Sequence, residues 1–431
     1  MDDLSPCIEA TALQDQTSAL IDAGQYDDAL RSIAVGVGSF YTRPDIIGYS
    51  LYLFGYDRLV QRLGEAMRDT SVPAETEARG GYLLILSEFY SAGGHSRVAE
   101  DLVSVLGGAV VVLTDMFGSY QSGRLKVADA RARMPKAMVH RLEDPSFAGK
   151  VRELQAVFSA VRPERVLILA HHPDPLPYVA AASLPQSVRK VFFHHCDHQP
   201  SVGCTLPGYE HVDFTEHLQT ICEKNLGRPA THMPLYVADR GVKTFSSPTL
   251  ETLTVVSSGS SNKYKRDGVL AYQNVVAEVL GLIGGNYWHI GHLDDAWLAL
   301  IRESLKARGI AENRFCYVAH VPSLWDSLKQ IDGHVFLGSF PIPGGRGSIE
   351  AQGCGYPAVY YANDDRAPLL RHADIFANKE LGWTDIPELL AALKTVAADH
   401  AAQTAQARDY YVRQYSYDVF VSRLNLALGR H

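Results

Sequence analysis

Short apolar, β-branched runs alternate with helical segments along most of this chain. One series extends from the run at 82–87 to the run at 232–235, and a second from 253–257 to 357–361. Strands that are apolar on both faces and separated by helices form parallel sheets covered on both sides. The sequence therefore predicts an α/β protein with two Rossmann-like domains in tandem. Ligands of such sheets bind at the carboxyl ends of the strands.

Changes in composition set the expected domain boundaries. Residues 1–75 have helical periodicity without strand signals, and the polar segment 238–251 contains glycine and proline, as interdomain linkers do. The segment 401–428 is predicted as one long helix. We expect four regions: a helical N-terminal region at 1–75, a Rossmann-like acceptor domain at 76–237, a Rossmann-like donor domain at 238–410, and a helix at 411–431 that crosses back to the first domain.

The N-terminal region contains a helix–turn–helix pattern of tetratricopeptide type. Gly24 is placed to make the turn, with Tyr26, Ala29 and Leu30 packing across it. One such unit cannot bury its own apolar face, so it must pack on a neighbouring element. Two interpretations stay open. We favour a plain helical hairpin that covers the next domain over a peptide-binding repeat.

Charge and composition exclude several classes of function. The 431 residues carry a net charge of −8 without a long run of Lys and Arg, which argues against a nucleic-acid partner. The six cysteines form no Cys-x-x-Cys pair, and the acidic start lacks an apolar signal segment. No stretch reaches the roughly 18 apolar residues of a membrane span. We expect a cytoplasmic protein with reduced thiols, for which peripheral association with a membrane stays open.

The segment 332–361 combines a strand, a Gly- and Pro-rich loop, a short helix expected at 347–353, and a second strand. Its loop and helix start contain Gly344, Gly345, Arg346, Gly347 and Ser348. Glycines allow a tight turn and a close approach to a ligand, and the unpaired N–H groups of a helix start favour phosphate. The spacing differs from the G-x-G-x-x-G pattern of dinucleotide sites. We predict an anion cradle, with simple turn chemistry as the alternative.

A second loop of small donors and cations follows the strand at 253–257. It contains Ser258, Lys263 and Lys265, and it would meet the glycine cradle at the same end of the sheet. Either lysine would neutralise a diphosphate leaving group, with Arg346 as a second clamp. A solvated loop with a helix cap is the alternative interpretation.

Two more residues complete the predicted nucleotide site. Glu350 lies in the first turn of the cradle helix, where a carboxylate either accepts the ribose hydroxyls or complements the helix dipole. We favour the ribose interpretation because the cradle already implies a nucleotide. His320 follows a strand of the same half and would stack on the base or bind it by a hydrogen bond, although a helix-capping histidine fits equally well.

Histidine and carboxylate side chains gather at the expected strand ends of the first half. They are Glu88, His95, His171, His172, Asp174, His194, His195, Asp197 and His198. Such a group suits general-base chemistry, because a carboxylate orients an imidazole and raises its basicity. The candidate catalytic residues are His95, His195, Asp197 and His198. The rival interpretation is a metal site with the ligands His194, Cys196, Asp197 and His198. Nearly adjacent ligands on one strand end cannot all converge, so we expect no metal.

The order of these motifs resembles the GT-B glycosyltransferases. The shared features are two Rossmann-like halves, a Ser/Lys loop opening the second half, a terminal crossing helix, and a strand–loop–helix with Glu350, Gly353, Gly355 and Pro357. The nearest resemblance is to the inverting O-linked N-acetylglucosamine transferase-like group. There a helical repeat region precedes the catalytic part, and a loop with Ser, Phe and His follows the first strand. The comparable residues here are Ser87, Phe89 and His95.

The resemblance implies transfer of a sugar from a nucleotide-diphosphate sugar, with a UDP-sugar favoured, to an acceptor hydroxyl without metal or cofactor. By position, Lys263 or Lys265 would hold the diphosphate, residues 344–348 would cradle it, and Glu350 would lie near the ribose. Retaining GT-B enzymes carry a second glutamate eight residues earlier, where this chain has Ile342, which favours inversion. The related group also has paired threonines in the cradle, which this chain lacks. The sugar therefore stays open, as does the acceptor, which is a glycan, a lipid-linked glycan or a protein.

The implied reaction is a single displacement. A histidine base of the first half deprotonates the acceptor hydroxyl, which attacks the anomeric carbon as the diphosphate leaves toward the positive loops. Three alternatives remain: a nucleotide-sugar epimerase of the same fold, a phosphorylase that needs pyridoxal phosphate, and a non-catalytic subunit that binds a sugar nucleotide.

Overall fold

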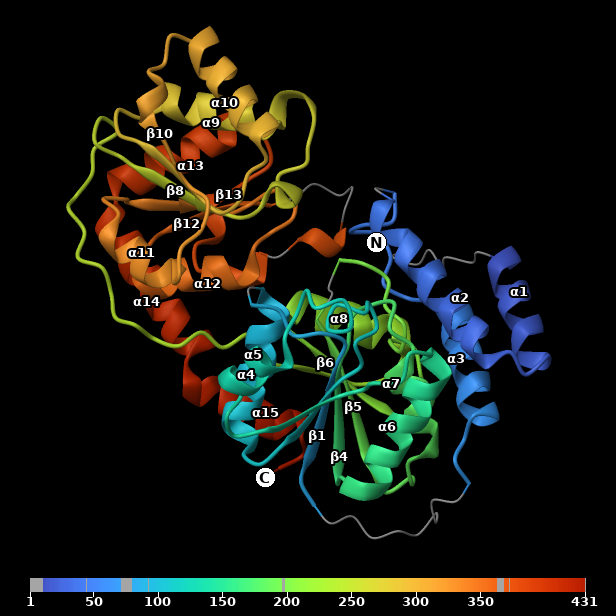
Figure 1. Cartoon of the computed structure of the whole chain (residues 1–431). Helices are drawn as coiled ribbons and strands as arrows, with labels where there is room; N and C mark the ends of the chain where they lie inside the picture. Colours follow the sequence, from blue (N-terminus) through green and yellow to red (C-terminus); the bar gives the residue numbers. More distant parts are fainter. Residues whose placement is uncertain are drawn as a thin grey trace. The chain divides into compact units, whose positions relative to one another are not determined.

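The chain divides into two compact units, each built on its own sheet (Figure 1). The computed structural model describes residues 11–43, 45–70, 80–91, 93–195, 198–362, 368–371 and 373–430. Unit 1 comprises Met1–Met233 and Arg423–His431, and unit 2 comprises Pro234–Ser422. All strand pairs are parallel, in a seven-stranded sheet in unit 1 and a six-stranded sheet in unit 2. The predicted pair of doubly wound α/β sheets is confirmed.

Unit 1 begins with three helices, α1 (Thr11–Asp22), α2 (Tyr26–Gly38) and α3 (Phe54–Ala66). Gly24 makes the turn between the first two at φ +73°, a conformation that favours glycine. The hairpin packs on helix α6 (Phe147–Val161), as a single repeat must pack on a neighbour. Asp27 Oδ1 accepts a hydrogen bond of 3.0 Å from the Ala148 backbone N–H, and the Arg31 guanidinium lies 4.7 Å from the Phe147 ring centre.

The sheet of unit 1 has the strand order β3-β2-β1-β4-β5-β6-β7. Its elements are β1 (Tyr82–Leu86), α4 (Gly94–Leu106), β2 (Val110–Leu113), α5 (Val127–Arg133), β3 (Met138–Arg141), α6, β4 (Arg165–Leu169), α7 (Leu176–Ala180), β5 (Arg189–His194), β6 (Tyr209–Asp213), α8 (Glu216–Leu226) and β7 (Ala230–His232). Strands β1 and β4 are buried on both faces because helices cover both sides. The order of strands reverses between β1 and β4, so the loops after these two strands diverge and make room for a ligand.

Unit 2 repeats this plan with the strand order β10-β9-β8-β11-β12-β13. Its elements are β8 (Val255–Ser258), α9 (Tyr272–Leu282), β9 (Tyr287–Ile290), α10 (Asp295–Ala307), β10 (Phe315–Val318), α11 (Leu324–Gln330), β11 (Val335–Leu337), α12 (Gly345–Cys354), β12 (Ala358–Tyr361), β13 (Gly382–Trp383), α13 (Ile386–Ala398), α14 (His400–Tyr415) and α15 (Tyr417–Ala427). The order reverses between β8 and β11. The two loops predicted to bind a diphosphate follow these two strands.

Two sequence expectations need correction at the end of the chain and before β8. The single helix expected at 401–428 is broken, because the Ser416 backbone is extended (ψ 163°) and its carbonyl accepts the Phe420 N–H at 3.0 Å, which starts α15. The segment expected as a linker is held against unit 2. The Trp325 indole N–H donates to the Gly241 carbonyl at 2.8 Å, and the Lys243 N–H donates to the Cys354 carbonyl at 2.9 Å.

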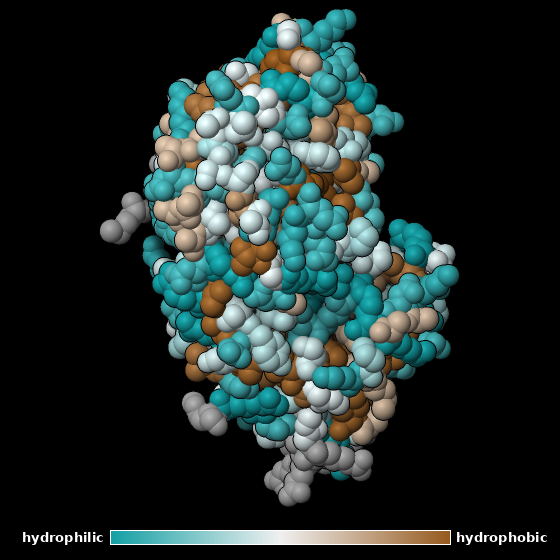
Figure 2. All heavy atoms as spheres, turned by 90° about the vertical axis from the view of Figure 1, so that its left-hand side faces the viewer, coloured by the Kyte–Doolittle hydropathy of each residue, from teal (hydrophilic) through white to brown (hydrophobic). Residues whose placement is uncertain are grey.

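Hydrophobic side chains at the surface are dispersed. The most exposed large ones are Val269, Met138 and Val35, which lie on different elements. The face drawn in Figure 2 shows small hydrophobic groups scattered among polar ones. Within the described ranges, no helix combines the length and the apolar character that crossing a bilayer requires.

Candidate functional site

The predicted phosphate-binding loops of unit 2 are joined by direct contacts. Ser258 ends β8, and a short 3-10 turn over Ser261–Lys263 follows it. The buried Tyr264 anchors this loop from beneath, with its hydroxyl 2.7 Å from Ser257 Oγ. The Lys263 carbonyl accepts a hydrogen bond of 3.3 Å from the Ile342 N–H of the loop after β11. The two loops are therefore fixed relative to each other by a backbone contact and a buried tyrosine.

The Lys263 ammonium lies beside the start of helix α12. A Cβ atom built on Gly344 would lie 3.3 Å from Lys263 Nζ and 3.1 Å from Ser339 Oγ. Ser339 Oγ in turn donates to the Ile342 carbonyl at 2.8 Å, which shapes the loop between β11 and the helix. Gly344 thus leaves room for a cation next to a helix N-terminus, an arrangement that suits a phosphate group.

Helix α12 begins earlier than the sequence predicted, at Gly345 instead of Gly347. Gly344 occupies the N-cap position, and no side chain caps the helix. The first intrahelical bond there joins the Ser348 N–H to the Gly344 carbonyl at 3.0 Å. Ser348 Oγ is buried and has no hydrogen-bond partner among the described residues. The cradle therefore presents the uncapped first turn over a buried hydroxyl, at the point where the strand order reverses.

Arg346 and Glu350 contact each other and neighbouring segments of unit 2. The Arg346 guanidinium donates to the Tyr236 carbonyl at 2.9 Å, and its Nε lies 3.7 Å from Glu350 Oε1. Glu350 Oε2 accepts the backbone N–H of Trp325 in α11 at 3.1 Å. Both side chains thus contribute to packing of the cradle helix against its neighbours. Their predicted contacts to phosphate and ribose stay predictions.

The remaining donor-site candidates lie at the surface of unit 2. Lys265 and His320 are both exposed. Arg266, to which the sequence assigned no role, follows β8, and its side chain reaches the end of β12. Its guanidinium donates to the Tyr361 hydroxyl at 2.7 Å and lies 4.9 Å from the centre of that ring. The sequence feature that could have pointed to Arg266 is its place directly after Lys263 and Lys265 in the loop that follows β8.

In unit 1, His95 lies in the first turn of α4, the helix that follows β1, and β1 is one of the two strands between which the strand order reverses. Its Nε2–H donates to the Leu169 carbonyl at the end of β4 at 2.7 Å. The proton is therefore on Nε2, and the lone pair is on Nδ1, which has no hydrogen-bond partner among the described residues. Burial lowers the pKa of His95 to about 4. The side chain is thus a neutral imidazole with an unused basic nitrogen near neutral pH.

Two further imidazoles lie against His95. Its ring centre is 4.6 Å from that of His171 and 4.7 Å from that of His195. His171 Nε2 donates to the Tyr90 hydroxyl at 3.1 Å, and Tyr90 donates to Glu88 Oε2 at 2.9 Å. Burial and the neighbouring His95 lower the pKa of His171 to about 3. The three rings come together although His95 is far from the other two in the sequence. His171 was not among the predicted catalytic residues.

His198, another predicted residue of this group, lies at its edge. His198 is beside His172, with 6.4 Å between the ring centres, and the His198 carbonyl accepts the Gly48 N–H at 2.8 Å. Asp197 and Cys196 lie outside the described residues.

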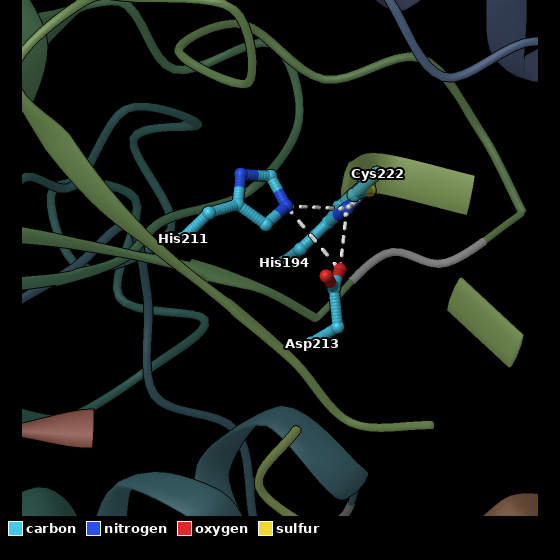
Figure 3. Close-up of side chains that lie close together, drawn as sticks. All are labelled: His194, His211, Asp213 and Cys222. Carbon is cyan, nitrogen blue, oxygen red and sulfur yellow. Dashed lines mark hydrogen bonds and ion pairs between the residues drawn. The ribbon is translucent and has the colours of Figure 1, made fainter. Parts of the chain in front are cut away.

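Asp174, close to these histidines in the sequence, has hydrogen bonds that hold the backbone in place. It is buried and accepts hydrogen bonds from Ser87 Oγ at 2.7 Å and Thr114 Oγ1 at 2.6 Å. It thereby fixes the chain just beyond β1 and β2. His194 lies close to His211, Asp213 and Cys222 (Figure 3). The rival metal set of His194, Cys196, Asp197 and His198 stays a hypothesis, because Cys196 and Asp197 lie outside the described residues.

Comparison with known proteins places this architecture. No family model and no curated protein matches the sequence. Among solved structures, a mutant O-GlcNAc transferase of Thermobaculum terrenum matches with a TM-score of 0.54 and 15% identity over 97% of this chain and 83% of that one. HepE of Anabaena, in complex with UDP and glucose, matches with a TM-score of 0.56 and 12% identity over 81% of this chain and 99% of that one. A glycosyltransferase of Rickettsia africae matches with a TM-score of 0.60 and 10% identity over 82% of this chain and 99% of that one.

The chain has the GT-B fold. The resemblance to the GT-B glycosyltransferases that the motifs indicated is confirmed at the level of the fold. In this GT-B chain the predicted phosphate-binding loops and the histidine group occupy equivalent places. Each lies where the strand order of its own sheet reverses, which is where open α/β sheets bind their ligands.

Proposed function

We propose that this GT-B-fold protein is a glycosyltransferase that uses a nucleoside diphosphate sugar, with UDP as the nucleotide. The observation that carries the proposal is the Lys263 ammonium beside Gly344 at the uncapped start of α12. A cation and free backbone N–H groups at a helix start bind and neutralise a pyrophosphate. The HepE structures with UDP, and with UDP-glucose, support the choice of nucleotide.

The proposed reaction is an inverting displacement with His95 as the base. His95 Nδ1 takes the proton of the acceptor hydroxyl, and the resulting oxygen forms a bond to the anomeric carbon. The bond between that carbon and the diphosphate oxygen breaks, and its electron pair leaves with the diphosphate. Lys263 and the N–H groups of α12 stabilise the charge on this leaving group, so the proposed mechanism needs no divalent metal.

For the cellular compartment and the acceptor we keep the proposals made from the sequence. Cys204, Cys222, Cys316 and Cys354 are free cysteines, which supports our proposal of a reducing, cytoplasmic location. We keep a glycan, a lipid-linked glycan and a protein as acceptor classes. A lipid-linked acceptor would bring the protein to a membrane surface.

Donor binding is the first test of the proposal. Titration calorimetry should show that UDP binds more tightly than UMP, because the second phosphate contacts Lys263 and α12. Lys263→Ala should weaken UDP by about 10-fold to 100-fold, in the range of a lost charge-assisted contact, and should leave UMP less affected. Lys306→Ala, an exposed lysine on α10, is the matched control for loss of one positive charge. If the protein binds UDP and UMP with equal affinity, and Lys263→Ala does not change either affinity, the proposed diphosphate site is wrong.

Turnover is the second test. The protein should consume a UDP-sugar faster when an acceptor from a panel of glycans, lipid-linked glycans and peptides is present. Release of UDP with no acceptor dependence and an isomerised sugar nucleotide would identify an epimerase. Tight UDP binding without consumption of any donor would identify a non-catalytic subunit.

A further inference from the structure

Four buried side chains of unit 1 point toward one another and form a group separate from the histidine group described above (Figure 3). His194 ends β5, His211 and Asp213 belong to β6, and Cys222 lies on α8. All four are at most 2% exposed. We call these residues the buried cluster. The proposed glycosyl transfer makes no use of it.

The spacing of the four ligand atoms is that of a metal coordination shell. His194 Nδ1 lies 3.1 Å from Asp213 Oδ1, His211 Nε2 lies 3.3 Å from both of these atoms, and Cys222 Sγ lies 3.5 Å from His194 Nδ1. All four atoms lie within 4.8 Å of one another. A tetrahedral zinc ion with bonds of about 2.0–2.1 Å to N and O and about 2.3 Å to S holds its ligands roughly 3.3–3.6 Å apart. The four separations given above follow this pattern, and the one to sulfur is the longest of them.

Hydrogen bonds between described residues leave several polar atoms of the buried cluster without a partner. His194 Nδ1 and His211 Nε2 both face Asp213 Oδ1 and also face each other. Both N–H groups can share Asp213 Oδ1 as acceptor, and Asp213 Oδ2 then still has no partner among the described residues. The outer atoms His194 Nε2 and His211 Nδ1 have no hydrogen-bond partner within the described part of the chain. A cation at the centre would accept a lone pair from all four inner atoms at once.

The donor set identifies the class of metal. Thiolate and imidazole ligands are unsuited to Mg²⁺ and Ca²⁺, which prefer oxygen, and two nitrogens, one sulfur and one oxygen in a tetrahedron suit Zn²⁺. Thiolate and carboxylate together balance the charge of a divalent ion, as a buried site requires. Four protein ligands without an open position make a structural site. The Tyr52 hydroxyl, 3.6 Å from Cys222 Sγ, is an outer contact to the sulfur.

We propose that His194, His211, Asp213 and Cys222 bind a structural Zn²⁺ ion that ties β5, β6 and α8 together. The sequence-based expectation of no metal considered adjacent residues at the end of β5. The cluster instead takes single residues from separate elements, which only the fold brings together. The ion would stabilise unit 1 and would take no part in the displacement.

Metal content and cobalt spectroscopy of the full-length protein test the proposal. Protein purified without chelator, or exposed to Zn²⁺ and then desalted, should hold one zinc per chain. Replacement by Co²⁺ should give the visible bands of tetrahedral cobalt and a thiolate-to-cobalt charge-transfer band. Cys222→Ser should abolish the charge-transfer band and weaken zinc binding by at least about tenfold. Cys354→Ser, a buried cysteine of unit 2, is the matched control and should leave both unchanged.

A measurement on the wild-type protein covers the case in which Cys222→Ser does not fold. Adding Zn²⁺ to chelator-treated wild-type protein should raise its melting temperature, because the ion binds the folded state preferentially. Adding Mg²⁺ at the same concentration should not. The proposal is overturned if the wild-type protein holds well under one equivalent of Zn²⁺ or Co²⁺ after exposure and its melting temperature does not change. Cobalt bands that persist unchanged in Cys222→Ser would equally overturn the assigned ligands.

Discussion

Lys263 Nζ lies 3.3 Å from the position that a Cβ atom would occupy on Gly344. Gly344 has φ −98°, which alanine adopts without strain, so the substitution Gly344→Ala adds one methyl group against the ammonium. We expect Lys263 to be displaced and UDP affinity to fall by about tenfold, since a displaced cation loses its charge-assisted contact. The free energy of unfolding should change by less than about 1 kcal/mol, because the end of a lysine side chain moves easily. Calorimetry with UDP and urea unfolding measure the two effects.

A double-mutant cycle shows whether Gly344 acts through the lysine. If it does, Gly344→Ala should weaken UDP binding much less in a Lys263→Ala background than in the wild type. Gly281→Ala on α9, where a Cβ meets no atom within 4 Å, is the control for a Gly-to-Ala change in the same unit. Independent, multiplicative effects of the two substitutions would contradict the proposed coupling.

Glu350 joins two helices, and its substitution separates that role from ribose binding. Glu350→Ala should lower the free energy of unfolding by about 1–3 kcal/mol, because it leaves the Trp325 N–H without its carboxylate acceptor. Glu350→Gln keeps an acceptor oxygen and should cost less than half as much. If the carboxylate also binds the ribose, both variants should weaken UDP. Wild-type UDP affinity in Glu350→Gln would show that the ribose prediction is wrong.

The lowered pKa of His95 predicts that turnover falls only at low pH. Its pKa is lowered to about 4, mainly by burial. The neutral base is therefore lost only as the pH falls through about 4, and kcat/KM should not decline near the ordinary histidine pKa of about 6.5. The folded state should also lose stability as the pH falls from about 6.5 to 4, because only the unfolded chain takes up this proton.

Substitution of His95 tests the same assignment at fixed pH. His95→Ala should lower kcat by about 10²-fold to 10⁴-fold, the usual contribution of a general base, and should change UDP affinity little. His140→Ala, a partly exposed histidine at the edge strand β3 of the same unit, should leave both unchanged. A His95→Ala enzyme with near wild-type kcat would exclude His95 as the base.

Asp57 predicts a stability effect away from the proposed chemistry. This buried carboxylate of α3 accepts hydrogen bonds from the Gly203 N–H at 2.7 Å, the Thr205 N–H at 2.8 Å and the Thr205 hydroxyl at 2.7 Å. Asp57→Ala should lower the free energy of unfolding by about 2–4 kcal/mol, because it leaves three donors without a partner. Thr205→Val removes one of these bonds and should cost about 1 kcal/mol. Urea unfolding that ranks the two in the opposite order would contradict this account.

Local patterns predicted most of the secondary structure and the main candidate site of unit 2. The apolar runs at 82–87, 253–257 and 357–361 agree with β1, β8 and β12 to within two residues at each end. The start of α12 was misplaced by two residues, since a run of glycines carries no signal for where a helix begins. Strand β13, with only Gly382 and Trp383, was missed because two residues have no periodicity.

Side-chain partners were the part that local patterns could not supply. Arg346 and Glu350 contact Tyr236 and Trp325, which are far away in the sequence and which no local pattern indicated. His194 was grouped with its sequence neighbours, whereas its partners are on β6 and α8. Such pairs depend on the order of strands in the sheet, which periodicity does not report.

The sequence by itself determined the two parallel α/β units and the loops that follow their strands, because hydrophobic periodicity and glycine placement act over a few residues. The tertiary structure decided which of these loops meet and which side chains share a point in space. It brought Lys263 to Gly344, His171 to His95, and Cys222 to His194. These contacts arise from the position at which each strand order reverses and from the face to which each strand residue points. Both are properties of the assembled sheet.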